Sequence, residues 1–389
     1  MRPAGSPTVL FYVQHLLGIG HVFRATRVAR ALSRAGAQVF MAWGGTRLPT
    51  IDLSGLEMIW LDPVKADGAM FSGLVDPRGA PFGEERKAAR RDALLRALDD
   101  IRPDIVITEA FPFGRRQMRF ELEPFMEAAR AAPWRPLTIA SIRDIMQENR
   151  KESRVAESLN WFRRCYDLLL VHGDPSLIRI EETLQGADAI LDKVRYSGLV
   201  TPDAPDLSQM PSHSADVVVS AGGGAVGHAL TGAAIGANRH SVRFPSNWLL
   251  VVGPERDEAE FAALRQAAGE GMDVVRFVPD LARVLASAKV SVSRAGYNTV
   301  GDLLRAGCRC VLVPFAGGRE TEQMRRAALL HARGVVAMLT DAELSPRALA
   351  EAVDRAATLL PLSADDLACD GADRSAEIVL AEYRSLRAG

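Results

Sequence analysis

Short apolar segments alternate with amphipathic, helix-like segments along this chain, and no other feature constrains the fold as strongly. In the first half the apolar segments are Val9–Gln14, Gln38–Trp43, Met58–Leu61, Asp104–Thr108, Pro136–Ala140 and Leu168–His172. In the second half they are Asp216–Ser220, Trp248–Val252, Val274–Phe277, Lys289–Val292, Cys310–Pro314 and Val335–Leu339. Apolar runs separated by helical patterns favour parallel sheets with helices on both faces. The sequence therefore predicts an α/β fold built from doubly wound, Rossmann-like sheets.

The two series of segments are separated by Tyr196–Asp206, which lacks periodicity and contains three helix breakers. A chain of 389 residues is also long enough for two domains. We therefore expect an N-terminal domain over residues 1–198 and a C-terminal domain over residues 199–364. Residues 365–389 are predicted to form a further helix.

Charge and hydropathy exclude several classes of partner. The net charge of -1 gives no reason to expect a nucleic-acid partner. The early apolar run Val9–Val13 ends at Gln14, so it is interpreted as a first strand and not as a signal peptide. Because no run approaches the roughly 18 apolar residues of a membrane span, we expect a cytoplasmic protein. A peripheral contact with the inner face of the membrane stays open.

One amphipathic segment carries the basic cluster Arg86, Lys87, Arg90 and Arg91. Such a face is most often simply solvated. The alternative is a contact with an anionic acceptor or a membrane surface. Elsewhere, the four cysteines lack metal-ligand spacing, and they are expected to be free thiols.

The segment from Val292 to Asp302 carries the strongest chemical signal. An apolar run turns at Ala295-Gly296 and opens a helix with a carboxylate in its first turns. A helix N-terminus presents unpaired N–H groups and a partial positive charge, which suit a diphosphate. A carboxylate further along the helix can accept hydrogen bonds from a ribose diol. Together with the polar loop from Pro314 to Gln323, this pattern indicates a nucleotide-sugar site.

On these motifs the second half of the chain resembles the C-terminal domain of glycosyltransferase family 28. The resemblance implies a GT-B fold, in which two Rossmann-like domains face each other across a cleft that binds the substrates. It also implies that the last helix packs back on the N-terminal domain. The donor would be a nucleoside-diphosphate sugar, with UDP as the favoured nucleotide.

The resemblance also assigns donor-binding residues. Asp302 stands where the family has a ribose-binding Glu, and it is one methylene shorter. Glu322 and Gln323 match a polar pair that reads the donor sugar, although the match requires one extra residue in the loop. The other implied donor residues are Val278, whose backbone would read the base, and Ser293, Arg294, Gly296 and Thr299 around the helix start.

Two glycine-rich turns follow predicted strands, where open α/β sheets bind ligands. The first contains Gly18 and Gly20, and the second contains Gly222, Gly223 and Gly224. Phe23 occupies the third glycine position of a dinucleotide fingerprint, which argues against NAD. Both turns resemble phosphate-side loops of family 28, but Gly224 stands where the family often has Ser.

The resemblance and the residues together predict an inverting, metal-independent glycosyltransferase that needs no cofactor beyond its nucleotide-sugar co-substrate. His21 is the first candidate for the general base, with Asp144 and Glu109 behind it. His21 has the alternative role of capping a helix, and each carboxylate has the alternative of pairing with an Arg. The acceptor stays open among lipid-linked, glycan and small-molecule hydroxyls. A sugar-nucleotide epimerase or hydrolase, and an inactive nucleotide-sugar-binding subunit, are the alternative functions.

Overall fold

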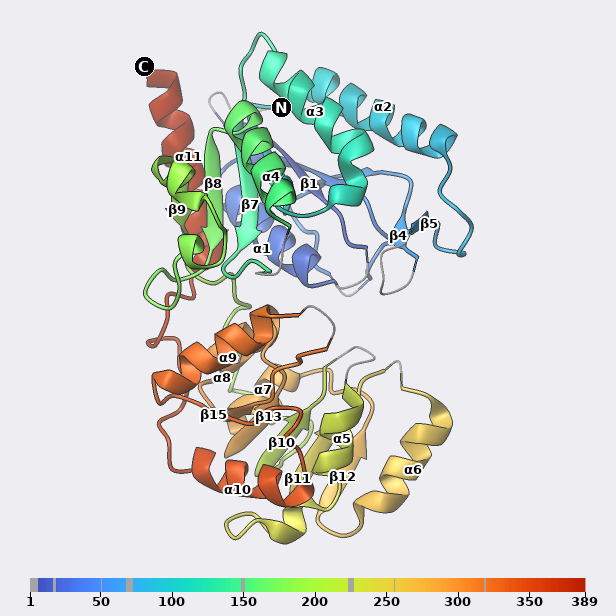
Figure 1. The fold of residues 1–389 in the computed structure, drawn as a ribbon, viewed down its shortest axis with the longest axis vertical. Coiled ribbons are helices and arrows are strands. Elements are labelled where there is room, and N and C mark those ends of the chain that lie inside the picture. The colour runs from blue at the N-terminus through green and yellow to red at the C-terminus, as the bar shows by residue number, and fades with distance from the viewer. Residues whose placement is uncertain are drawn as a thin grey trace. The chain divides into compact units, whose positions relative to one another are not determined.

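The computed structural model describes residues 6–16, 19–49, 51–67, 73–147, 151–222, 227–254, 256–317 and 320–388. These residues form two compact units (Figure 1). Unit 1 contains the chain up to Asp144, a stretch that ends at Val200, and everything from Asp370 onward. Unit 2 contains Thr201–Cys369 and a short segment that starts at Ile145. The unit boundaries lie a few residues beyond the expected positions 198 and 364.

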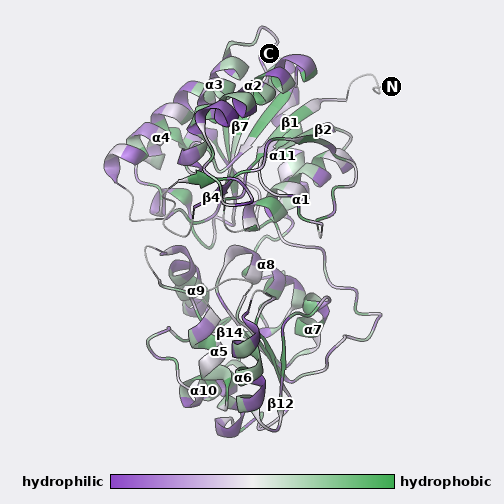
Figure 2. Cartoon of the chain, turned by 90° about the vertical axis from the view of Figure 1, so that its right-hand side faces the viewer, coloured by the Kyte–Doolittle hydropathy of each residue, from purple (hydrophilic) through white to green (hydrophobic). Residues whose placement is uncertain are grey.

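Unit 1 is built on a seven-stranded sheet with the order β3-β2-β1-β6-β7-β8-β9. All neighbouring strands in this sheet are parallel. The strands are β1 (Thr8–Val13), β2 (Gln38–Trp43), β3 (Glu57–Trp60), β6 (Ile105–Glu109), β7 (Leu137–Arg143), β8 (Leu168–His172) and β9 (Val194–Tyr196). Strands β1, β6 and β8 are buried throughout, and Figure 2 colours β1 and β7 mostly hydrophobic. This burial explains their continuous apolar sequences.

In the part of the chain that the structure describes, this sheet is accompanied by the helices α1 (Gly20–Arg34), α2 (Glu84–Ile101), α3 (Arg119–Ala131), α4 (Glu152–Cys165) and α11 (Gly371–Ala388). Helices α2 and α3 pack side by side, as do α1 and α11. Val28 and Leu32 of α1 share one apolar core with Val379 and Leu380 of α11 and with the sheet. The last helix of the chain is therefore part of the core of unit 1. Short 3-10 helices connect other elements of the unit: η1 (Arg116–Met118), η2 (Ile180–Glu182) and η3 (Ala187–Lys193).

Unit 2 has a six-stranded parallel sheet with the order β12-β11-β10-β13-β14-β15. Its strands are β10 (Val217–Ser220), β11 (Trp248–Val251), β12 (Met272–Val275), β13 (Val290–Ser293), β14 (Arg309–Leu312) and β15 (Ala337–Met338). Its helices are α5 (His228–Ala234), α6 (Glu258–Ala268), α7 (Leu281–Ser287), α8 (Tyr297–Ala306), α9 (Glu322–Ala332) and α10 (Pro346–Ala356), with the 3-10 helix η5 (Ala237–His240). The predicted fold class is confirmed in both units.

Several predicted segments differ from the structure in their first or last residues. Strand β12 ends at Val275, two residues before the expected end, and the side chain of Phe277 is 61% exposed beyond it. The apolar character of Phe277 had suggested that the strand continued. Between β3 and α2 the structure also contains a small antiparallel pair that was not predicted, β4 (Lys65–Ala66) and β5 (Leu74–Val75).

The expected linker is partly buried where it begins. Leu199 and Val200 are at most 1% exposed, and Val200 forms an antiparallel bridge with Asp370. The N–H of Gly371 donates to the carbonyl of Leu199 at 3.0 Å. A Cβ atom at Gly371 would lie 2.5 Å from the carbonyl oxygen of Gly198. The start of the linker is therefore packed against the start of α11 and is not a free connection.

Two members of the basic cluster on α2, Arg86 and Arg90, form ion pairs within unit 1. Arg90 is buried, and its Nε donates to Glu121 at 2.5 Å. Arg86 forms ion pairs with Asp62 and Asp76 on the connecting segment before α2. These two arginines therefore tie α2 to α3 and to the preceding loop. The alternative role of the cluster, a contact with an anionic acceptor or a membrane surface, stays a prediction.

Among the described residues, no helix combines the length and the apolar character that crossing a membrane requires. All four cysteines are buried free thiols, as expected.

Candidate functional site

The histidine at the start of α1 is paired with a buried carboxylate. His21 lies in the first turn of α1, the helix that follows β1 in the chain. Glu109 is the last residue of β6, the strand next to β1 in the sheet. His21 Nδ1 lies 3.1 Å from Glu109 Oε1. Parallel strands bring their carboxyl ends to one edge, so the sheet itself creates this pair.

Glu109 is held by three neighbours. Arg24, one turn after His21 in α1, donates to Glu109 Oε1. Ser141 of β7 donates to Glu109 Oε2 at 2.6 Å. Burial alone would raise the pKa of the Glu109 carboxyl, but the Arg24 guanidinium and the hydrogen bond with His21 hold this pKa well below its usual value. Glu109 is therefore an ionised carboxylate with both oxygens engaged.

The same surroundings keep His21 neutral. Burial lowers the pKa of His21 to about 3, and the guanidinium groups of Arg115 and Arg24 act in the same direction. The hydrogen bond to Glu109 opposes them and does not outweigh them. A neutral imidazole has one bare ring nitrogen, which is the form that a general base requires.

Exposure separates the three candidates for the base. The side chain of His21 is 24% exposed, whereas that of Glu109 is fully buried. Asp144, directly after β7, is 2% exposed, and its Cβ packs closely over Gly173. A base must touch the hydroxyl whose proton it removes, so the structure favours His21. Glu109, expected as an alternative base, instead supports the imidazole.

His21 does not cap its helix. The N-cap of α1 is Ile19, and no side chain accepts a capping hydrogen bond there. Gly20 is the first residue of α1, whereas Gly18 lies outside the described residues. Sequence reasoning missed Arg24 and Ser141, which join Glu109 from a helix and a strand. An Arg three residues after His21, on the same helix face, was the available signal for Arg24.

The predicted donor residues of unit 2 gather around the start of α8. Gly296 is the N-cap of this helix, so the first N–H groups of α8 follow it directly. Thr299 and Asp302 lie in its first two turns and are partly exposed. Ser293 is 1% exposed, and its hydroxyl lies 3.0 Å from that of Ser291 inside the sheet. The side chain of Ser293 thus faces the interior of the sheet.

Arg294 has a structural partner. Its side chain is 5% exposed and forms an ion pair with Asp341 at 2.6 Å. The same nitrogen donates to the carbonyl of Val313 at 3.2 Å. Arg294 therefore joins the turn after β13 to the turn after β14 and to the segment after β15. In this arrangement its charge is already neutralised, which argues against the expected direct contact with a diphosphate.

Glu322 and Gln323 begin α9, and both fasten neighbouring loops. Glu322 is 3% exposed and pairs with Arg326 at 2.7 Å. Arg326 also donates to the carbonyl of Ala295 at 3.0 Å, so it links α9 to the turn before α8. Gln323 Oε1 accepts from the N–H of Phe315 at 3.1 Å. The pair expected to read the sugar therefore lies beside the α8 start, and Glu322 is engaged in a buried ion pair.

The remaining donor predictions fall at other strand ends of unit 2. Gly222 follows β10 with a φ of +80°, a conformation that favours glycine. Gly223 and Gly224 lie outside the described residues. Val278, whose backbone was expected to read the base, is 2% exposed.

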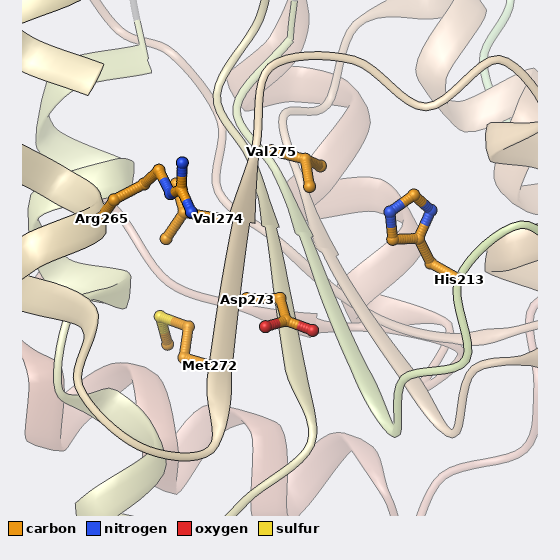
Figure 3. Close-up of a pocket in the computed structure, with 6 residues that line it drawn as sticks. All are labelled: His213, Arg265, Met272, Asp273, Val274 and Val275. Carbon is orange, nitrogen blue, oxygen red and sulfur yellow. The ribbon is translucent and has the colours of Figure 1, made fainter. Parts of the chain in front are cut away.

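A hollow of about 300 Å³ lies elsewhere in unit 2, along the edge strand β12 (Figure 3). It is lined by Met272, Asp273, Val274 and Val275 of the strand, with His213 and Arg265 beside it. None of the predicted donor residues lines this hollow. Within the described ranges, no group of three or more His, Cys, Asp or Glu side chains is arranged to hold a metal ion.

Comparison with known proteins identifies the domain that carries the α8 start. A model of the glycosyltransferase family 28 C-terminal domain matches residues 228–361. This segment is similar to the family 28 C-terminal domain. The predicted resemblance is thereby confirmed for the half of the chain that carried the motifs.

Curated relatives of the family 28 domain share one name. A UDP-N-acetylglucosamine--N-acetylmuramyl-(pentapeptide) pyrophosphoryl-undecaprenol N-acetylglucosamine transferase of Trichlorobacter lovleyi is 32% identical over 101 residues, which cover 26% of each chain. The chain thus spans about a quarter of the length of this relative. The enzyme of the same name from Xanthomonas euvesicatoria is 28% identical over 355 residues, 89% of this chain and 74% of the relative.

Solved structures extend the similarity of fold beyond the family 28 domain. The calicheamicin glycosyltransferase CalG4 matches with a TM-score of 0.60 at 18% identity, covering 98% of this chain and 95% of that one. MurG of Acinetobacter baumannii matches with a TM-score of 0.59 at 17% identity, covering 96% and 100%. The two units are therefore the two Rossmann-like domains of the GT-B fold.

Proposed function

We propose that this protein is an inverting glycosyltransferase that moves a sugar from a UDP-sugar to an acceptor hydroxyl. The observation that carries the proposal is the His21–Glu109 pair in a chain that also contains a family 28 domain. The names of the curated relatives support UDP-N-acetylglucosamine as the first donor to test. They also make a lipid-linked acceptor the first acceptor class to test.

The reaction is a single displacement at the anomeric carbon of the donor. The acceptor oxygen bonds to this carbon while the bond from the carbon to the diphosphate oxygen breaks. His21 takes the acceptor proton on Nε2, and Glu109 stabilises the resulting imidazolium. The bonding electrons leave with UDP, whose growing charge would be met by the first N–H groups of α8. Asp302 would accept hydrogen bonds from the ribose hydroxyls.

The stereochemistry of the product tests this proposal. The full-length chain is incubated with UDP-N-acetylglucosamine and with other UDP-sugars, together with hydroxyl acceptors of the lipid-linked, glycan and small-molecule classes. Proton NMR of the product then gives its anomeric configuration. We expect a β-linked product from an α-linked donor. A retained configuration contradicts the single displacement, and release of free sugar or an epimerised donor without transfer indicates the alternative reactions.

A further inference from the structure

The Glu109 carboxylate is the end of a hydrogen-bonded row that crosses the edge of the unit 1 sheet. Ser141 of β7 connects Glu109 to His172, because its Oγ lies 2.9 Å from His172 Nε2. His172 is the last residue of β8, and its Nδ1 lies 2.9 Å from the hydroxyl of Ser197. Each of these side chains comes from a different strand end. All are at most 2% exposed.

The protonation states of these groups determine which one donates and which one accepts in each hydrogen bond of the row. An ionised Glu109 only accepts hydrogen bonds, so the Ser141 hydroxyl donates to it. The Ser141 oxygen can then only accept from His172, which requires the His172 proton on Nε2. His172 is neutral, because its pKa is lowered to about 3. Burial is the main cause, and the positive charge of Arg24 is the second. Its bare Nδ1 therefore accepts from Ser197.

Helix α11 contributes the last side chain of the row, Ser375, which lies next to His172. Ser375 of α11 donates to the carbonyl of Gly371, and its oxygen lies 3.4 Å from His172 Nδ1. The Ser375 proton is therefore already used, so Ser197 is the hydroxyl that can donate to His172 Nδ1, in competition with the carbonyl of Gly198, which lies 3.1 Å from the Ser197 hydroxyl. Since the protons of Ser141 and His172 both point toward Glu109, the row favours the charged, acceptor-only form of this carboxylate.

Two neighbours compete for the same nitrogen of His21. Glu109 Oε1 lies 3.1 Å from Nδ1 and favours a proton there. Arg24 is a donor that lies 3.0 Å from Nδ1 and favours a bare nitrogen. Only the first arrangement leaves Nε2 bare. The tautomer of His21 therefore depends on how firmly the Glu109 carboxylate is held opposite Nδ1.

We propose that His172, acting through Ser141, is a positioning residue that fixes Glu109 and thereby sets the tautomer of His21. The two residues do not touch substrate and act only through the carboxylate. This inference rests on the proposed function of His21 as a base, but the tautomer itself is measurable without turnover. Arg24, Arg115 and His172 are the titratable or charged neighbours that act on the His21–Glu109 pair.

The experiment compares four variants of the full-length chain with the wild type. His172→Leu removes the donor to Ser141, and Ser141→Ala removes the bridge with a smaller change. His172→Gln keeps an N–H donor near the place of Nε2. Tyr166→Phe is the matched control, because it removes another buried hydrogen bond of unit 1, the 2.8 Å contact with Thr108. Nitrogen-15 NMR of the seven histidines at neutral pH reports each tautomer.

We expect His21 to carry its proton on Nδ1 in the wild type, in His172→Gln and in Tyr166→Phe. His172→Leu and Ser141→Ala should show a mixture of tautomers at His21. In turnover, His172→Leu should lower kcat about tenfold, the scale of one lost hydrogen bond, with the KM for the donor sugar unchanged within about twofold. His172→Gln should restore most of kcat.

An unchanged His21 tautomer in both His172→Leu and Ser141→Ala overturns the proposal. A His172→Gln protein as impaired as His172→Leu also overturns it, because the Nε2–H donor would then not matter. If His172→Leu does not fold, Ser141→Ala decides the tautomer alone. If the wild type transfers no sugar, the proposed function fails, while the NMR comparison still decides the role of His172.

Discussion

His21 carries an imidazole that is neutral because of its neighbours and its burial. An ordinary histidine has a pKa near 6.5, so a histidine base loses activity as the pH falls through that value. Here burial and two guanidinium groups lower the pKa of His21 to about 3. The neutral, proton-accepting form is therefore present at lower pH than usual.

The base assignment leads to a prediction about rate and pH. His21→Ala should lower turnover by about 10²–10⁴, the range for a lost general base, with donor binding nearly unchanged. For the wild type, kcat/KM should stay level from about pH 8 down to about pH 5, because His21 is not protonated in that range. Steady-state kinetics and calorimetry with UDP measure both quantities.

Asn160→Ala is a suitable control for His21→Ala, because Asn160 is an exposed residue of α4. Near-normal turnover in His21→Ala would remove His21 from the role of base and return it to Asp144. Loss of UDP binding in the same variant would instead make His21 a donor contact.

Sequence reasoning reached His21 and Glu109 separately, but it could not pair them. The two residues are 88 positions apart, and they meet only because β1 and β6 are neighbours in the sheet order. Strand order is a tertiary property that one sequence does not reveal. The same limit hid His172, which looked like the ordinary end of an apolar strand, and the Asp341 partner of Arg294.

At the scale of elements, the alternation of apolar and amphipathic segments predicted which segments form strands. It predicted the first and last residues of those strands less accurately. Strands β2 and β8 coincide with the predicted segments. Strand β9 and the β4–β5 pair were not predicted, because two or three residues carry too little periodicity to be recognised. Burial of the linker start was also hidden, since its glycine and prolines suggested an exposed connection.

Helix α11 supplies the prediction at this scale. A Cβ atom at Gly371 would lie within 2.6 Å of three backbone atoms of Gly198 and Leu199. Backbone atoms cannot move aside cheaply, so Gly371→Ala should lower the free energy of unfolding of unit 1 by about 1–3 kcal/mol. Differential scanning calorimetry of the full-length chain measures the effect.

The matched control is Gly232→Ala in α5, where an added Cβ meets no atom within 4 Å. This control should be neutral or slightly stabilising, because alanine favours helix over glycine. An unfolding temperature of Gly371→Ala equal to that of the wild type would contradict the close packing of the start of α11 on Gly198 and Leu199.

At the scale of the whole molecule, the fold class and the family of the second half could be predicted, because both rest on local patterns that repeat along the chain. The function of side chains in the donor region was harder to predict. The family pattern placed Arg294 and Glu322 at the ligand, whereas the structure engages both in ion pairs. A motif fixes the position of a residue along an element, but the partners come from other elements.

The metal requirement of the whole enzyme gives a further prediction. We expect turnover to survive EDTA, because the α8 start offers N–H groups and a partial positive charge for the diphosphate. Turnover with a UDP-sugar is measured before and after chelation, with Mg²⁺ or Mn²⁺ added back. Activity that disappears in EDTA and returns with either ion would contradict the metal-independent mechanism.

The division of the chain also sets an order of events during its synthesis. Unit 1 is closed by Ala376, Val379 and Leu380 of α11, which leave the ribosome after all of unit 2. The first 200 residues must therefore wait, with part of their apolar surface uncovered, while Thr201–Cys369 are translated. Unit 2 is nearly continuous in sequence and has no such delay. The half of the protein that is made first is the half that is completed last.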